Sequence, residues 1–330
     1  MVSRRKTDLL SNLPDCLLVT IISLLPFKQS VQTSVLAKRW KNLCLETTNL
    51  VFKESEFVNL SADDTKTIKS ERALFVRTMC QWISSFTGQV IESLEFYLSG
   101  PVSFEKEIIS LTEFAASKQI KNVVIDFSIP ASRKIEVVEH LVTLMHYQNT
   151  EFDITRIFFN LIHVRNLTIC SFLIQMIQDC EDPMELHDAM EARHLVMKTN
   201  LHANEFIGIT IFFNSCPKLE SLTFDMDATE RILRVSLPLD PKTFWLTNGT
   251  YDCLERTLKV VKVKNFRGGS NELHVLKYLI RRGRVMERLD LYEAKGLNDD
   301  QTRLVLTAAE EVQKNVERGS KHLRITLHKA

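Results

Sequence analysis

Apolar side chains recur in this chain with two different periods. From residue 91 onward an apolar-x-x-apolar-x-apolar pattern returns repeatedly, and its second half alternates like a strand with one buried face. The clear copies are Ile91/Leu94/Phe96, Ile120/Val123/Ile125, Val164/Leu167/Ile169, Leu219/Leu222/Phe224, Leu258/Val261/Val263 and Met286/Leu289/Leu291, with a looser copy at Leu195/Met197 and a last strand at Leu323/Ile325/Leu327.

Helix-forming stretches separate these strands, for example residues 105–117, 135–145, 203–214, 272–282 and 299–317, the last with Gly319 as its expected C-cap. Neighbouring copies of the pattern lie 27 to 44 residues apart. Strand–helix units in such a series predict an irregular solenoid that resembles a leucine-rich-repeat array. A non-repeating α/β domain with the same alternation is the alternative.

The first fifty residues follow a helical period instead. Leu17, Leu18, Ile21, Ile22 and Leu25 form the stripe of an amphipathic helix. Two further short helices are expected over residues 29–36 and 38–44. Three short helices bury little core by themselves, and an apolar helical face is a common device for docking on another protein's groove.

Local residues define the ends of the first helix. Pro14 suits the first turn, where its missing N–H would be unpaired anyway, and Asn12 is a good capping residue. Pro26 ends the helix, because the residue before a proline is driven out of the helical region.

This segment closely resembles the plant F-box. The resemblance is carried by LSNLPDCLLVTIISLLPFKQSVQTSVLAKRWKNLC, in which many fixed positions stand at fixed spacing. The matching positions are Leu13, Pro14, Asp15, Leu17, Leu18, Ile21, Ser23, Leu25, Pro26, Thr33, Ser34, Val35, Leu36, Lys38, Arg39 and Trp40. Cys16 and Cys44 depart from the family pattern, where an acidic residue and a tryptophan are usual.

The resemblance implies a docking function. F-box domains bind the Skp-type linker protein of a cullin-RING ubiquitin ligase, while the rest of the chain selects the substrate. The positions that the resemblance assigns to this interface or its support are Leu13, Pro14, Leu17, Ile21, Leu25, Val35 and Trp40. Replacing Leu13 and Pro14 together by Ala is therefore expected to weaken capture of the linker.

A second resemblance covers residues 258–292. The string LKVVKVKNFRGGSNELHVLKYLIRRGRVMERLDLY is similar to the FBD module that follows F-box and leucine-rich-repeat regions in plants. Its plan is strand, turn, helix and strand. Gly268 and Gly269 permit positive φ at the turn, and Ser270 or Asn271 is expected to cap the helix.

These patterns predict three parts: an F-box domain over residues 7–52, a leucine-rich-repeat-like region over 53–253, and an FBD-like region over 254–330. The expected fold class is α+β or α/β solenoid, with a small three-helix domain preceding an irregular array that ends in a strand–helix–strand unit. The middle resembles leucine-rich repeats only in style.

Composition adds a charge asymmetry. The chain has 330 residues, is 45% hydrophobic and 25% charged, and carries a net charge of +1, so wholesale disorder is excluded. Residues 1–50 and 254–330 are net basic, whereas residues 51–253 are net acidic, which suggests a substrate with a basic patch. The C-terminal cluster of Lys277, Arg281, Arg282, Arg284 and Arg288 beside Tyr278 leaves nucleic-acid association as a lesser alternative.

The cysteine count and the N-terminus indicate a cytoplasmic or nuclear protein. Seven widely spaced cysteines without a C-x-x-C pair predict reduced, mostly buried thiols. The basic residues 4–6 and the apolar run 17–25 imitate a signal peptide, but Asp8 and Asp15 lie between them and no small-x-small cleavage site follows. We expect no membrane association.

Candidate chemistry is weak elsewhere. His187, Glu191 and His194 fall on one helical face, but no zinc motif accompanies them, and Asp225 and Asp227 lack the glycine and closing acid of a calcium loop. No nucleophile elbow, Walker loop or dinucleotide fingerprint is present. We therefore expect no catalytic, cofactor-binding or metal-binding residues. Trp245, in a long predicted loop, is expected to fold back as a lid, with a binding anchor as the alternative.

Together these features predict a substrate-recognition subunit of an SCF-type ubiquitin ligase, whose substrate-binding residues are unknown. The alternatives are an F-box scaffold acting outside a ligase, a nucleic-acid-associated repeat protein, and a hydrolase hidden in the array.

Overall fold

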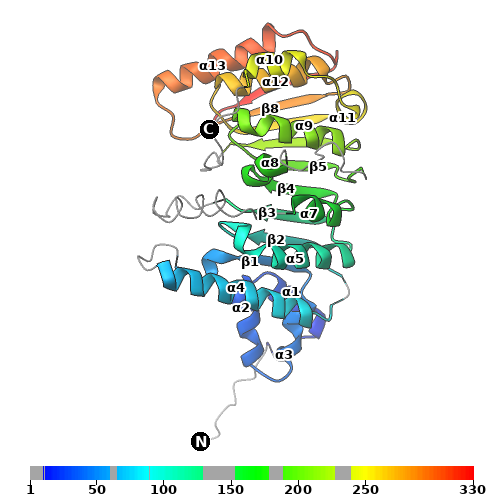
Figure 1. Cartoon of the computed structure of the whole chain (residues 1–330), viewed down its shortest axis with the longest axis vertical. Helices are drawn as coiled ribbons and strands as arrows, with labels where there is room; N and C mark the ends of the chain where they lie inside the picture. The colour runs from blue at the N-terminus through cyan, green and yellow to red at the C-terminus, as the bar shows by residue number, and fades with distance from the viewer. Residues whose placement is uncertain are drawn as a thin grey trace, which may run out of the picture.

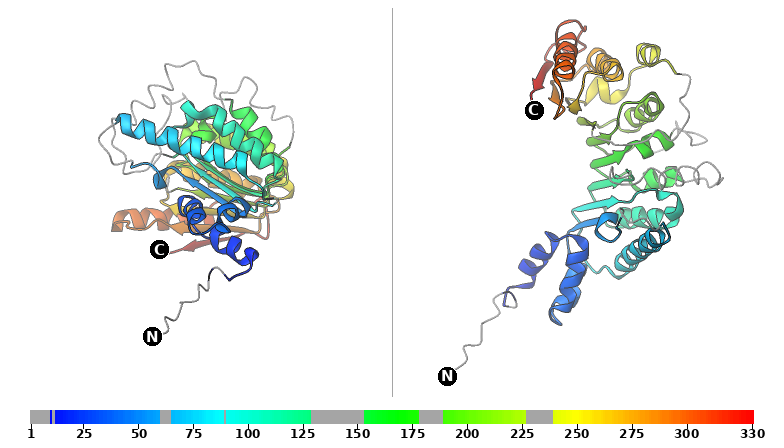
Figure 2. Two further views of the ribbon diagram at one scale, coloured as in Figure 1. Left: turned by 90° about the horizontal axis from the view of Figure 1, so that it is seen from below. Right: turned by 90° about the vertical axis from the view of Figure 1, so that its left-hand side faces the viewer.

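The strands of this protein form one continuous parallel sheet. The computed structural model describes residues 10, 12–59, 65–88, 90–128, 153–177, 189–226 and 239–330. Nine strands within these ranges pair in chain order, each parallel to the next (Figure 1). The strands stack edge to edge along the molecule, with helices covering one face of the sheet (Figure 2). A parallel sheet of this kind is compatible with the expected repeat array.

Eight of the strands coincide with the predicted copies of the apolar pattern. The strands are β1 (Asn49–Lys53), β2 (Ser93–Tyr97), β3 (Asn122–Asp126), β4 (Asn166–Cys170), β5 (His194–Lys198), β6 (Ser221–Asp225), β7 (Val260–Phe266), β8 (Arg288–Glu293) and β9 (Arg324–His328). Strand β1 is the unpredicted one. Its signal is Thr47/Leu50/Phe52, which fits the pattern except that a buried threonine takes the first apolar position.

The helices occupy the intervals between the strands. After the N-terminal helices, these are α4 (Thr65–Ser85), α5 (Glu105–Ser117), α7 (Ile154–Asn160), α8 (Ser171–Met176), α9 (Phe206–Ser215), α10 (Pro241–Thr247), α11 (Asp252–Arg256), α12 (Ser270–Arg282) and α13 (Asp299–Lys314), with 3-10 turns η3 (Glu54–Glu56), η4 (Pro101–Phe104) and η6 (Ala203–Glu205). The predicted helix at 135–145 lies outside the described residues.

Two predicted helix caps in the C-terminal region are wrong. Helix α13 ends at Lys314, short of Gly319. A Cβ at Gly319 would lie 2.5 Å from the backbone oxygen of Arg281, so this glycine allows a close backbone approach to α12 instead. At the start of α12, the backbone N–H groups of Arg267 and Gly268 donate to the Glu272 carboxylate at 3.1 and 3.2 Å, so neither Ser270 nor Asn271 caps the helix.

The main core lies between the sheet and its helices. On each strand the residues of the apolar pattern are buried, as with Leu94 and Phe96 on β2, which are 2% and 0% exposed. Phe96 stacks on Phe75 of α4, which shows that this strand face points to the helices. Burying a side chain of this size stabilises the fold by about 1.5–3 kcal/mol. The pattern therefore determines which face of the sheet the helices cover.

The N-terminal helices form a separate, smaller core. They are α1 (Asp15–Ser23), α2 (Phe27–Gln32), η1 (Thr33–Val35), α3 (Trp40–Leu43) and η2 (Cys44–Glu46). Leu18, Ile22, Trp40, Leu43 and Cys44 pack together in a cluster distinct from the main core. Helix α1 has Pro14 as its N-cap and no side-chain cap, so the predicted capping role of Asn12 is wrong.

Phe27 of α2 connects the N-terminal helices to the sheet. Although it belongs to the helical segment, its side chain is buried in the main core. Its ring meets Phe52 of β1 edge-on at 4.7 Å and Trp82 of α4 at 5.7 Å. Lys28 Nζ donates to the backbone oxygen of Glu56 at 2.9 Å. The N-terminal unit is therefore packed against the first strand of the sheet.

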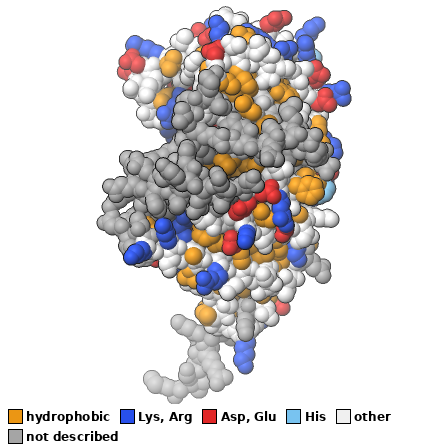
Figure 3. Space-filling view, in the orientation of Figure 1, with side chains coloured by type: hydrophobic (Ala, Val, Ile, Leu, Met, Phe, Trp, Pro, Cys, Tyr) orange, Lys and Arg blue, Asp and Glu red, His pale blue; other side chains and the backbone are white. Residues whose placement is uncertain are grey.

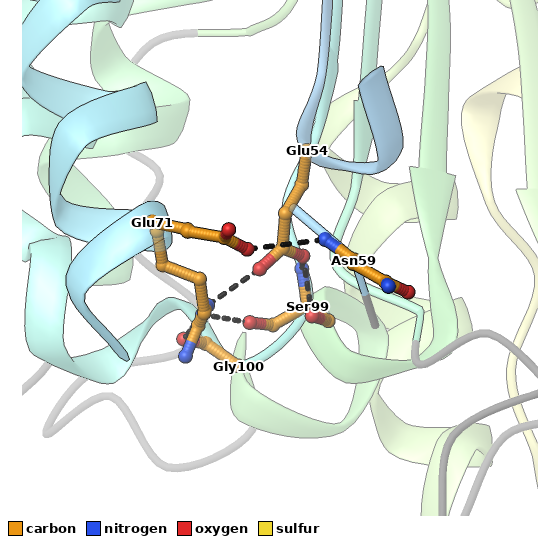
Figure 4. Close-up of polar contacts among 6 residues, drawn as sticks. Glu54, Asn59, Glu71, Ser99 and Gly100 are labelled. Carbon is orange, nitrogen blue, oxygen red and sulfur yellow. Dashed lines mark hydrogen bonds and ion pairs between the residues drawn. The ribbon is translucent and has the colours of Figure 1, made fainter. Parts of the chain in front are cut away.

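A buried ion pair lies at the end of β1 (Figure 4). Arg72 of α4 and Glu54, immediately after β1, have side chains only 5% and 4% exposed, and their Nε and Oε1 atoms lie 2.5 Å apart. Arg72 also donates to the backbone oxygens of Ser99 and Gly100, while the Ser99 N–H donates to Glu54 at 2.7 Å. The pair thus joins α4, the end of β1 and the loop after β2.

Replacing Arg72 with Met should destabilise the protein by about 3–5 kcal/mol, because the Glu54 carboxylate would stay buried without its cation. Arg156→Met is the matched control, since the pair of Arg156 with Glu113 is exposed and contributes about 0–1 kcal/mol. The measurement is urea unfolding followed by circular dichroism. Equal losses in the two variants would contradict the structural role of the buried pair.

A second buried carboxyl, that of Glu205, belongs to the last residue of η6 and caps the start of this short helix. Glu205 is fully buried and its side chain accepts from the His202 N–H at 2.7 Å, while His202 Nδ1 accepts from the Asn204 N–H at 3.3 Å. This reciprocal cap satisfies two donors of the helix start. Burial raises the pKa of Glu205 above its usual value. The folded protein therefore favours the neutral carboxyl more strongly than the unfolded chain does.

This preference makes stability depend on pH. The stabilisation is complete below the unfolded pKa, about 4.3, and is lost as pH rises through the raised folded pKa. Glu205→Gln keeps an acceptor for His202 but cannot ionise, so its free energy of unfolding should rise relative to the wild type across that pH window. Urea unfolding at a series of pH values measures this. Glu310→Gln, at an exposed position, is the control; parallel profiles for the wild type and Glu205→Gln would refute the prediction.

Candidate docking surfaces

The N-terminal helices expose large apolar side chains. Leu17, Ile21 and Leu24 on α1 are 48%, 38% and 79% exposed, and Val35 and Leu36 are 83% and 66% exposed. These five residues are called the N-terminal apolar surface below. The adjacent side of α1 is formed by Leu18 and Ile22, both fully buried. Since the helix is apolar on both sides and only one is used internally, the other is available to a partner.

The seven predicted docking residues separate into exposed and buried positions. Pro14, Leu17, Ile21 and Val35 are exposed, and Leu13 and Leu25 are half-buried. Trp40 is 5% exposed and packs in the small core, so its contribution to a partner surface would be indirect. Their docking role stays a prediction.

Sequence reasoning missed Leu24 and Leu36. Leu24 lies seven residues after Leu17 and three after Ile21, which places these three residues on one helical stripe. A stripe of this spacing next to the buried one is the signal that could have identified the second apolar side of α1.

An ion pair fixes the geometry of this surface. Arg39 pairs with Asp15 at 2.6 Å, and its guanidinium also donates to the backbone oxygen of Leu13 at 2.5 Å. These contacts tie the segment before α3 to the start of α1. They therefore hold Leu17 on α1 and Val35 in η1 within one small folded unit.

The second surface is the helix-free face of the sheet. Alternate residues of each strand point away from the helices, and those at the strand starts are mostly amides and hydroxyls. Ser93 Oγ donates to Asn49 Oδ1 at 2.8 Å, and Asn166 Nδ2 donates to Asn122 Oδ1 on the neighbouring strand. The outward residues at the strand starts are Asn49, Ser93, Asn122, Asn166, His194, Ser221, Val260, Arg288 and Arg324.

The outward residues near the strand ends are charged and aromatic. Lys198 pairs with Asp126, and Lys264 pairs with Asp225 at 3.6 Å. Burial alone would lower the pKa of Lys198, but the bond with Asp126 outweighs it and the pKa is raised. Tyr97 lies beneath the ammonium group of Lys198, 5.5 Å from its ring centroid. This part of the face combines a ring with paired charges.

The expected acidity of the middle segment is not found on this face. Asp126 and Asp225 are each neutralised by a lysine, and Glu95 accepts a hydrogen bond from the Tyr97 hydroxyl. The suggestion of a basic-patched substrate therefore has no support from the described sheet face. On the opposite, helix-covered side, Lys, Arg, Asp and Glu side chains are interspersed around the C-terminal helices, and apolar side chains reach the surface lower down (Figure 3).

Trp245 is a structural residue. It lies on α10, is 3% exposed and packs edge-on against Phe206 at 5.1 Å and close to Tyr278 at 4.9 Å. The lid interpretation is confirmed and the exposed anchor is wrong, because the segment closes over α9 and α12.

The predicted basic cluster is divided: Arg281, Arg282 and Arg284 line one pocket, and Arg284 lines a second pocket together with Arg288. Lys277 pairs with Glu311 at 2.5 Å and Arg288 with Asp290 at 3.0 Å, whereas Arg282 donates to the backbone oxygen of Asn248 at 3.3 Å. Tyr278 is buried, and its hydroxyl donates to the backbone oxygen of Gly249. It therefore offers no stacking platform to a nucleic-acid base.

Within the described ranges, no group of three or more His, Cys, Asp and Glu residues is placed to hold a metal, and His187 and Asp227 lie outside those ranges. No described helix is long and apolar enough to span a bilayer. Six cysteines are described, and no disulfide joins any two of them; burial raises the pKa of Cys253 to about 12, so its thiol stays protonated. Cys180 lies outside the described residues.

Two domain families match this chain. The F-box domain matches residues 10–50, which comprise the N-terminal helices and the beginning of β1. The FBD family matches residues 248–291, which comprise α11, β7, α12 and most of β8. The two resemblances inferred from the residues are thereby confirmed.

Relatives of similar organisation are found in Arabidopsis thaliana. The F-box protein At3g62230 is 30% identical over 463 aligned residues, covering 99% of this chain and all of the relative. The putative F-box/LRR-repeat protein At5g54820 is 31% identical and covers 96% of this chain and 97% of its own. The F-box/FBD/LRR-repeat protein At5g22660 is 26% identical and covers 76% of this chain and 50% of its own. The first alignment is longer than the 330 residues of this chain, so that relative carries segments without a counterpart here. The chain belongs to the plant F-box family whose members combine an F-box with LRR-repeat and FBD regions.

Proposed function

We propose that this protein is a substrate-recognition subunit of an SCF-type cullin-RING ubiquitin ligase. The observation that carries the proposal is the N-terminal apolar surface within the F-box match. Its side chains lie at helical spacing, and an amphipathic helix of this kind binds in an apolar groove. The partner we assign to it is a Skp-type linker protein, which in turn binds cullin and RING subunits.

The sheet array is the part we assign to substrate selection. It is a leucine-rich-repeat-like array in which the FBD unit of β7, α12 and β8 is followed by α13 and the last strand, β9. Its helix-free face presents a continuous set of hydrogen-bonding and charged groups. A face of this kind can bind an extended partner over several strands. The domain limits proposed are 7–52, 53–253 and 254–330.

The proposed mechanism involves no bond chemistry by this chain. Binding of the linker at one end and of a substrate on the array makes ubiquitin transfer an encounter within one complex, which raises the effective concentration of the acceptor lysine. The packing of Phe27 and the Glu54–Arg72 pair supports this role, since a well-packed junction holds the two surfaces at one distance. The protein would act in the cytoplasm or the nucleus.

An F-box scaffold outside a ligase is the second candidate. The specific observation in its favour is that the alignment with the first relative leaves parts of that relative without a counterpart here. A shortened array could pair with the linker without retaining a substrate. Polyubiquitylation of a protein captured together with the chain separates the two candidates.

Replacing Leu17 and Val35 together by Ala should weaken linker capture by about tenfold or more, because both side chains would be buried in the groove of the partner. The measurement is a quantitative pull-down with purified Skp-type linker, with thermal unfolding as the test of folding. Leu304→Ala is the matched control, since Leu304 is 52% exposed on α13 at the other end of the molecule. Undiminished capture by a folded double variant would refute the linker site.

Replacing Tyr292 and His328 by Ala should reduce substrate capture and leave linker capture unchanged. The two rings stack at 4.5 Å on the helix-free face, where Tyr292 is 37% exposed. The measurement is affinity purification from plant extract with the ligase arrested, followed by mass spectrometry. The Leu17/Val35 variant should show the reverse result. An unchanged set of captured proteins in the Tyr292/His328 variant would count against this face as the substrate surface.

A further inference from the structure

A basic cavity lies at the N-terminal ends of the C-terminal strands. The cavity has a volume of about 820 Å³ and lies between the segments that enter β7, β8 and β9. Its lining includes Arg256, Lys259, Arg284, Arg288, His322 and Arg324. Arg288 and Arg324 are the first residues of their strands and face away from the helices, next to the start of the helix-free face.

Most of this positive charge has no internal counterion. Lys259 pairs with Glu287 at 3.3 Å, and Arg288 pairs with Asp290 at 3.0 Å. Arg256, Arg284 and Arg324 have no acidic partner among the described residues, and all three are exposed. Three uncompensated guanidinium groups around one cavity repel each other in the free protein. An anionic ligand would remove this repulsion.

The donor chemistry favours phosphate. A guanidinium presents a planar pair of N–H donors that matches two oxygens of a phosphate, whereas a lysine acts as a point charge. A phosphoserine carries about −1.5 to −2 charges, so two of them balance three arginines. No Phe, Tyr or Trp side chain lines the cavity, so a nucleic-acid base would find only the ring of His322 to stack on.

The cavity also continues into a surface suited to peptide backbone. The strand-start positions next to Val260 are Ser221, His194 and Asn166, all able to hydrogen-bond. A peptide with its phosphates between Arg284 and Arg324 could extend along these groups. We propose that the cavity binds a doubly phosphorylated segment of the recruited protein. This inference rests on the proposed substrate-recognition function and names the chemical class of its substrate.

The test measures binding of the full-length chain to a pool of short peptides that carry two phosphoserines in otherwise degenerate sequence. The unphosphorylated pool should bind about tenfold more weakly or worse, and R284Q/R324Q should lose about tenfold or more of the phosphopeptide affinity. R256Q is a second variant at an exposed position, and R284K/R324K should restore part of the affinity. R303Q is the matched control, because Arg303 is an exposed arginine of α13 outside the cavity.

Each alternative outcome overturns the proposal. Equal binding of the two peptide pools, or unchanged binding by the folded R284Q/R324Q and R256Q variants, excludes a phosphopeptide site. Inorganic pyrophosphate that binds as tightly as the pool would show that the cavity recognises phosphate alone. Single-stranded RNA that binds more tightly, with a steep salt dependence and sensitivity to the same variants, would identify a nucleic-acid site. Linker capture, measured on the same samples, reports separately on the proposed ligase function.

Discussion

Main-chain pairing of β1 with β2 is the interaction on which the rest of this molecule depends. Strand β1 follows directly after the N-terminal helices, and its five residues pair in register with Ser93–Tyr97. Phe27 is buried against Phe52 on the same strand. The N-terminal unit is therefore packed directly against the first strand of the array, and its position is set by the sheet.

The same parallel pairing separates the two faces of the sheet. When parallel strands follow each other in chain order, the chain must return after each strand to the end of the sheet where the strands begin. Here the helices that make these returns cover one face of the sheet (Figure 2). The strand residues that point to this helix-covered face are the buried apolar ones. The other face carries polar, charged and aromatic side chains such as Asn122, Lys198 and Tyr97, with valines such as Val124 and Val196 between them. The arginines at the starts of β8 and β9 lie together at one end of the sheet. The N-terminal apolar surface lies on helices that precede this sheet, whereas the surface proposed for recognition is a face of the sheet itself.

Buried ionisable side chains make directional contacts at two places in this structure. Glu54 and Arg72 pair just after β1, and their directional bonds join α4, the end of β1 and the loop after β2. Glu205 precedes α9, and its carboxyl accepts a hydrogen bond from the His202 N–H in the cap of η6. Glu54 and Glu205 do not stand out in the sequence, because each directly follows a polar residue and therefore has the pattern of a surface residue.

Local pattern by itself determined eight of the nine described strands, the helices α5, α9, α12 and α13, and the F-box and FBD segments, because alternation and helical spacing record which face of each element is buried. Thus Leu94 and Phe96 identify β2 and its core face without any distant contact. Tertiary structure alone decided what the remaining positions do. Trp245 became a core residue, Leu24 an exposed one, and Arg284 and Arg324, forty residues apart, came to line one cavity. These outcomes depend on which strands lie side by side, and neighbours across a sheet leave no periodic signal in the chain.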